Sequence, residues 1–90
     1  ISPAAHAQLN AIQSAVADAA RANEGRVTWA HQSAHHFEST VVNALAIDVS
    51  VPAAGVDAVR RVLDAHGNTE LMAVTAYGGA TIVRAICWCL

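Results

Sequence analysis

The last strand of the chain, Ala80-Thr81-Ile82-Val83-Arg84-Ala85-Ile86-Cys87-Trp88-Cys89-Leu90, decides the fold. Alternation along this stretch places two sets of side chains on opposite faces of a strand. One set is Ile82, Arg84, Ile86, Trp88 and Leu90; the other is Val83, Ala85, Cys87 and Cys89. A strand in a small antiparallel sheet normally alternates apolar and polar residues, because one face meets water. Since both faces are apolar here, we expect the second face to contact another chain or another part of a larger protein.

The residues just before this strand predict its partner. Tyr77-Gly78-Gly79-Ala80 is typical of a tight hairpin turn, because glycine accepts positive φ. We therefore expect a strand over residues 70–77. A helix is predicted over residues 53–66, with apolar residues at helical spacing on its inner side and Gly67 at its end.

The first half of the chain repeats the same plan. Ser2-Pro3 predicts a helix start, and apolar residues at three-to-four spacing predict a helix over residues 3–23. Gly25 is expected to end this region. Strands are predicted over residues 26–37 and 40–51.

The element order is therefore α-β-β-α-β-β, in which a helix followed by a hairpin occurs twice. No linker or low-complexity tract interrupts it, so residues 1–90 form a single domain. The simplest packing is an α+β two-layer sandwich, with a four-stranded antiparallel sheet and both helices on one face. Such a packing leaves the opposite sheet face without helices.

Composition excludes some classes of function. Apolar residues make up 54% of the chain and charged residues only 13%, which argues against disorder and for a surface hidden by a partner. The net charge is -2, and the chain has no lysine and no basic cluster, so nucleic-acid binding is not expected. No apolar run reaches the length of a membrane span. The chain starts at Ile1 rather than Met, which is typical of a processed precursor or of a domain from a longer protein.

The residues favour an interaction domain over an enzyme. There is no complete catalytic signature and no nucleotide-binding glycine loop. We expect a contact surface formed by Ile82, Arg84, Ile86, Trp88 and Leu90 and centred on Ile82, Ile86 and Trp88, either as the open sheet face or through edge pairing of the last strand. The other tryptophan, Trp29, is expected in or near the core.

One alternative is a small metal- or ligand-binding domain. His31 and His35 with Cys87 and Cys89 offer the residue types of a Cys2His2 zinc site, although their spacing fits no standard zinc pattern. The competing interpretation is that the histidines lie on the surface and the cysteines are buried apolar residues. No cofactor is otherwise expected. A further alternative is an inhibitor or immunity-type protein, which the low-charge, acidic composition permits.

The pattern also resembles a known family: the small periplasmic domains of bacterial type II secretion and type IV pilus inner-membrane platforms, of the L and M subunit and pilus alignment type. The resemblance covers nearly the whole chain and rests on pattern and element order. It is carried by the helix with Leu9, Ile12 and Val16, the run Leu45-Ala46-Ile47-Asp48-Val49-Ser50-Val51, the helix from Val56 to Leu63, the strand from Leu71 to Tyr77 and the final strand.

The resemblance implies a circularly permuted ferredoxin-like fold and a non-enzymatic role in assembly. It also implies homodimers, or heterodimers with a related subunit, at the periplasmic face of the inner membrane. Attachment to the membrane would then use a segment outside this chain. Without the resemblance, a cytoplasmic location is the alternative.

Overall fold

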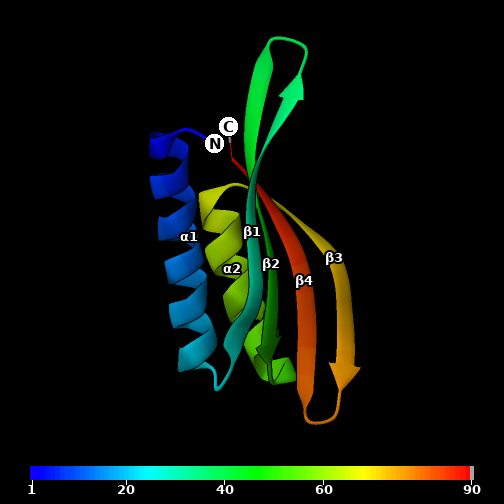
Figure 1. Cartoon of the computed structure of the whole chain (residues 1–90). Helices are drawn as coiled ribbons and strands as arrows, with labels where there is room; N and C mark the ends of the chain where they lie inside the picture. The colour runs from blue at the N-terminus through cyan, green and yellow to red at the C-terminus, as the bar shows by residue number, and fades with distance from the viewer. Residues whose placement is uncertain (90) are drawn as a thin grey trace.

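The chain folds in the predicted α-β-β-α-β-β order. Figure 1 shows the computed structural model, which describes residues 1–89. The elements are α1 (Pro3–Ala22), β1 (Arg26–Phe37), β2 (Thr40–Val51), a short 3-10 helix η1 (Ala53–Gly55), α2 (Val56–His66), β3 (Asn68–Tyr77) and β4 (Ala80–Cys89).

Element boundaries differ little from those predicted. The predicted helix over 53–66 starts with the 3-10 turn η1 before it becomes α-helical. Strand β3 begins two residues earlier than expected, because Asn68 and Thr69 already pair with Trp88 and Cys87 of β4. The strands over 26–37 and 40–51 have the predicted bounds.

The sheet has the strand order β1-β2-β4-β3, and all neighbouring strands are antiparallel. Both helices lie on one face of it (Figure 1). Moving β4 to the start of the chain would give the β-α-β-β-α-β order of a ferredoxin-like fold. The protein is therefore a permuted ferredoxin-like two-layer sandwich, as predicted.

The position of β4 corrects one expectation. Edge pairing through the last strand requires β4 to lie at an edge of the sheet, but β4 lies between β2 and β3 and pairs with both. The backbone hydrogen bonds of an inner strand are used on both sides, so β4 has no free edge to offer. The edges are β1 and β3.

Helix α1 begins and ends where its sequence signals predict. The Ser2 hydroxyl accepts a hydrogen bond from the Ala5 N–H at 3.1 Å, as expected of an N-cap. At the other end, the N–H groups of Asn23 and Gly25 donate to the Ala20 carbonyl, at 3.0 and 2.7 Å. These bonds satisfy a carbonyl that the end of the helix would otherwise leave without a partner.

Gly25 and Gly67 follow the two helices and have the same reason to be glycine. A Cβ on Gly25 would lie 2.3 Å from the Ser50 carbonyl oxygen of β2, and one on Gly67 would lie 2.4 Å from the Trp88 carbonyl oxygen of β4. Each glycine thus lets the chain pass close to a central strand. A glycine at the corresponding position of each half agrees with the helix-and-hairpin repeat that the sequence predicts.

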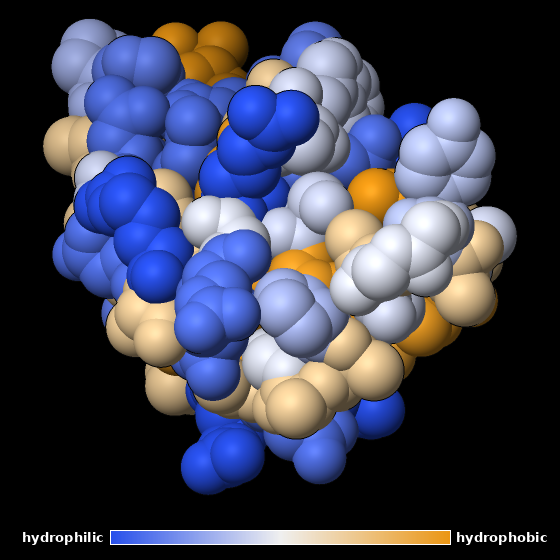
Figure 2. Space-filling model, turned by 90° about the horizontal axis from the view of Figure 1, so that it is seen from below, coloured by the Kyte–Doolittle hydropathy of each residue, from blue (hydrophilic) through white to orange (hydrophobic). Residues whose placement is uncertain are grey.

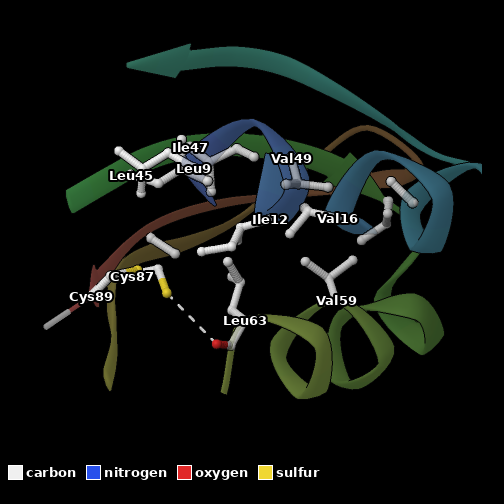
Figure 3. Packing of buried hydrophobic residues seen from close by; sticks show 13 residues of the cluster. Leu9, Ile12, Val16, Leu45, Ile47, Val49, Val59, Leu63, Cys87 and Cys89 are labelled. Atoms are coloured by element: carbon white, nitrogen blue, oxygen red, sulfur yellow. Dashed lines mark hydrogen bonds between the residues drawn. The ribbon is translucent and has the colours of Figure 1, made fainter. Parts of the chain in front are cut away.

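The core lies between the sheet and the two helices (Figure 3). Its residues come from one face of each helix and from alternate positions of β2 and β4. They are Leu9, Ile12, Val16, Ala20, Leu45, Ile47, Val49, Val51, Val59, Leu63, Ala85, Cys87 and Cys89. The helix-facing side of β4 is therefore part of the core, and its opposite side is not.

A polar ring also joins α1 to β1, which the sequence pattern did not predict. Gln32 of β1 contacts His6 Nδ1 through its Oε1 atom, and its Nε2 donates to the Asn10 side chain; both distances are 2.7 Å. Asn10 Nδ2 closes the ring on His6 Nε2 at 3.2 Å. These bonds hold α1 against a strand that contributes few apolar side chains to the core.

The packing predicts that Leu63→Ala is strongly destabilising. Leu63 is fully buried, and it packs from α2 against the sheet. Truncation of a buried leucine removes burial energy and leaves a cavity, at a cost of about 2–5 kcal/mol. The free energy of unfolding, measured by urea titration, should fall by that amount.

Arg61→Ala in the same helix is the matched control, since Arg61 is exposed. A surface substitution of this kind changes stability by about 0.5 kcal/mol or less. Equal effects of the two substitutions would contradict the placement of Leu63 in the core.

Candidate interaction surface

The sheet face opposite the helices, called the open face below, is made of alternate residues from all four strands. Directly opposed residues of neighbouring strands share a face. Trp29, Asp48, Arg84 and Ala73 form one such row across β1, β2, β4 and β3. The other members of the open face used below are His31 and His35 of β1, Ala46 of β2, Thr75 and Tyr77 of β3, and Ile82, Ile86 and Trp88 of β4.

The two faces of β4 are those that the sequence predicts. Val83, Ala85, Cys87 and Cys89 are buried on the helix side, whereas Ile82, Ile86 and Trp88 are half-buried on the open face. Arg84 is exposed among them. Leu90, the fifth predicted contact residue, lies outside the described residues.

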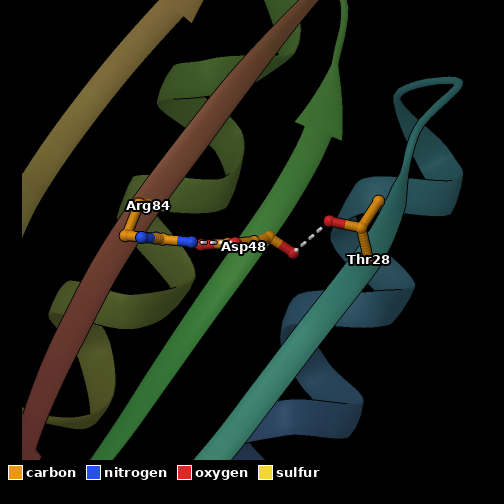
Figure 4. A network of polar contacts seen from close by, with 3 residues as sticks. All are labelled: Thr28, Asp48 and Arg84. Carbon is orange, nitrogen blue, oxygen red and sulfur yellow. Dashed lines mark hydrogen bonds and ion pairs between the residues drawn. The ribbon is translucent and has the colours of Figure 1, made fainter.

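An ion pair occupies the centre of the open face (Figure 4). The Arg84 guanidinium donates from Nε and Nη2 to the two Asp48 carboxylate oxygens, each at 2.8 Å. The Thr28 hydroxyl donates to the Asp48 carbonyl oxygen at 3.3 Å. The indole ring of Trp29 lies beside the guanidinium, with its centroid 5.8 Å from Arg84 Cζ.

Asp48 and Arg84 neutralise each other's charge. The Asp48 side chain is only 13% exposed, against 59% for Arg84. Hydrogen bonding and attraction from Arg84 hold the pKa of the Asp48 carboxyl below its ordinary value, although burial acts in the opposite direction. Because the bidentate geometry uses both carboxylate oxygens, Asp48 needs no further cation when the open face is covered.

Irregularities in both edge strands flank the ion pair. The register of β1 shifts between Val27 and Trp29, beside Asp48, and that of β3 shifts between Leu71 and Ala73, beside Arg84. Each shift inserts one extra residue, as in a β-bulge. The matching positions again reflect the repeat of the two halves.

The bulge in β1 corrects the prediction for Trp29. Strict alternation puts Val27 and Trp29 on one face, and we expected Trp29 in or near the core. The extra residue reverses the alternation, so Val27 packs against the core while Trp29 lies on the open face, 47% exposed. A one-residue irregularity moves every following side chain to the other face, and no local sequence signal announces it.

Aromatic rings line the β1 side of the open face. Trp29 stacks on His31 with centroids 6.0 Å apart, and His35 stacks on Phe37 at 6.4 Å. His35 and Trp88 also make a T-shaped contact with ring centroids 4.9 Å apart, which links β1 to β4 across the intervening strand. Trp88 is thus contacted by His35 and is half-buried.

The proposed set of two histidines and two cysteines is not brought together. His31 and His35 lie on the open face, whereas Cys87 and Cys89 lie on the helix side of β4. Cys87 Sγ contacts the Leu63 carbonyl oxygen at 3.6 Å (Figure 3), and Cys89 Sγ contacts that of His66 at 3.9 Å. The sheet separates the two pairs, so these four side chains cannot hold one metal ion. Alternation along the last strand places both cysteines on the face opposite Trp88, but because both faces are apolar it does not say which of them the helices cover.

Both cysteines are free thiols in the core. Burial, followed by the neighbouring Cys89, raises the pKa of the Cys87 thiol to about 11. A thiol with such a pKa is protonated at neutral pH and is a poor nucleophile or metal ligand. Cys87 therefore acts as a packing residue.

Residues 1–89 contain no pocket and no group of three or more His, Cys, Asp or Glu side chains placed to hold a metal ion. No helix in this range is long and apolar enough to cross a membrane. No family model, curated protein or solved structure matches the chain.

The ion pair predicts a stability difference that depends on pH. Asp48→Asn should lower the free energy of unfolding at about pH 7, because the charge partner of Arg84 is lost. Since the pKa of Asp48 is lowered by folding, the stabilisation is complete above its ordinary pKa and is lost as the pH falls through the lowered value. The difference between wild type and variant should therefore vanish in strong acid, as measured by urea unfolding at several pH values.

Glu70→Gln is the matched control, since Glu70 is an exposed carboxylate of β3 on the same sheet. Its stability difference from wild type should be small at every pH. An Asp48→Asn difference that persists unchanged into strong acid would contradict a role for the charge.

Proposed function

We propose that this protein is a non-enzymatic interaction and assembly domain, which buries its open face against another protein subunit. The observation that carries the proposal is the row of half-buried apolar residues Ile82, Ile86 and Trp88 on a sheet face with no helix over it. A four-stranded sheet in a small domain ordinarily presents mostly polar residues on its water-facing side. Apolar surface gathered in one place is typical of a binding site.

The charges of the open face suit burial. Asp48 and Arg84 neutralise each other through two hydrogen bonds, so a covering partner need not supply a counter-charge. A pair that is already formed loses less on desolvation than a single charge left without a partner. Over the centre of the open face the partner surface is therefore expected to be apolar and aromatic, with a cation only where it meets the exposed Glu70, which lies opposite Ile86.

Trp88 is the proposed anchor of this contact. It lies beside Ile86 on the open side of β4, and its ring makes a T-shaped contact with His35. Tryptophans held in place within an apolar surround dominate the energy of many protein interfaces. The rigid strand beneath fixes the ring before binding, which lowers the entropy lost on association.

The permuted ferredoxin-like fold supports a more specific proposal. It is the fold expected from the resemblance to the periplasmic domains of type II secretion and pilus platforms. On that basis we propose a role as a platform subunit that forms dimers with a related subunit at the periplasmic face of the inner membrane. Identification of the partner that the open face binds tests this assignment.

The proposal predicts that Trp88→Ala weakens association much more than folding. Loss of an anchor tryptophan typically weakens binding about thirtyfold or more. The purified domain would be immobilised and used to capture partners from an extract of its own host, with captured proteins quantified by mass spectrometry. Capture of a platform-type subunit by wild type, and its loss with Trp88→Ala, is the expected result.

Val41→Ala is the control, since Val41 is an exposed apolar residue of the β1–β2 hairpin that pairs with His36 and lies on the sheet face opposite Trp88. It should leave capture unchanged, and urea unfolding should show both variants folded. If Trp88→Ala lost stability and capture to the same extent, Trp88 would be a core residue and the proposal would fail. Capture of an enzyme that the domain inhibits would instead favour the inhibitor interpretation.

A further inference from the structure

The two edges of the sheet differ in how they are protected from other strands. Edge strands present free backbone N–H and C=O groups, and monomeric proteins block them with charges, prolines or bulges. The β1 edge carries Arg26 and three histidines along its length. The β3 edge contains one charged residue, Glu70, and no proline or lysine.

Strand β3 is also apolar and exposed. Met72, Val74 and Tyr77 are 54%, 52% and 77% exposed. Strand β3 lies at the end of the sheet farthest from α1 (Figure 1). Figure 2 views the molecule from below, from the end with the β3–β4 turn, and most of the deeply hydrophilic surface in that view lies on the α1 side. The edge with fewer charged residues is therefore also the more apolar one.

The regular part of β3 begins after its bulge. From Ala73 to Tyr77 the strand pairs with β4 without a shift, so its outer edge is straight over these five residues. All five are uncharged, and Val74, Thr75 and Tyr77 favour strands. Glu70 lies on the other side of the bulge and takes no part in this segment.

We propose that this segment pairs antiparallel with the same segment of a second copy, centred on Thr75. Such a pair has two-fold symmetry and closes as a dimer. Thr75 then faces Thr75 of the second copy, a favourable cross-strand pair. Tyr77 lies opposite Ala73, and Val74 opposite Ala76, so each large side chain meets a small one.

Pairing with a second copy covers this edge, so the edge does not need charged residues to keep other strands away. Within the paired segment no two like charges face each other. Glu70 falls opposite Ala80 of the second copy, which lies beyond the turn. The large-to-small matching across the axis is a property of β3 against itself, which favours a second copy over an unrelated extended peptide. Main-chain hydrogen bonds supply the attraction, as in strand addition at other sheet edges.

The product is a continuous eight-stranded sheet. A two-fold axis perpendicular to the sheet keeps the helices of both copies on one side and joins the two open faces on the other. The homodimer therefore leaves Trp88 and Ile86 free in each copy. This inference goes beyond the proposed function and does not rest on it, since the pairing uses the outer backbone edge of residues 73–77, whereas Ile86 and Trp88 lie beside Glu70 and Asn68, outside that segment.

The test is a charge exchange at the axis. Thr75→Lys and Thr75→Glu are each expected to raise the dimer dissociation constant at least about tenfold, because two like charges then face each other. An equimolar mixture of the two variants should regain the dimer, since opposite charges now meet. Light scattering and sedimentation of the purified domain across a dilution series, at low salt, measure the mass.

Thr40→Lys is the matched control: an exposed threonine of the other hairpin receives the same charge. It should leave the dimer intact, and urea unfolding should show all variants folded. A wild-type protein that stays monomeric at high concentration overturns the inference, as does an equal effect of Thr40→Lys or a failure of the mixed variants to pair. Capture through Trp88 is a separate readout, so failure of one surface is not mistaken for failure of the other.

Discussion

The antiparallel pairing of β2 with β4 is the interaction on which the rest of the structure depends. It joins two α-β-β halves that otherwise touch mainly through their helices. On one side it presents Ile47, Val49, Val83 and Ala85 to the core; on the other it sets Asp48 against Arg84. Because two helices cover only one face of four strands, this pairing also creates the open face.

Most of the fold could be predicted from the sequence because its signals are local. Ser2-Pro3 starts α1, Gly78-Gly79 makes a turn, and β1 and β2 have the predicted bounds. The position of β4 at the centre of the sheet was missed. Strand order depends on which hairpin edges meet in space, and the apolar character of both faces of β4 fitted an edge strand in contact with a partner as well as an inner strand.

The candidate surface was predicted in part. The two faces of β4 follow from alternation, so Ile82, Arg84, Ile86 and Trp88 lie together as expected. The contribution of Trp29 could not be foreseen, because it depends on a bulge whose cause lies in pairing with β2. The ion pair was missed for a related reason: Asp48 and Arg84 become neighbours only once the register between β2 and β4 is known.

The same register bears on how the chain reaches its native state. Each hairpin joins strands that are adjacent in sequence, so both can form early and locally. Within residues 1–89, the pairing of β2 with β4 is the only strand pairing between the two halves, and even its nearest partners, Val51 and Thr81, are thirty residues apart. The entropy of closing that loop must be overcome before the core gains its contacts. The folding barrier of this protein is therefore expected to lie at the docking of two preformed halves, and not at the formation of either hairpin.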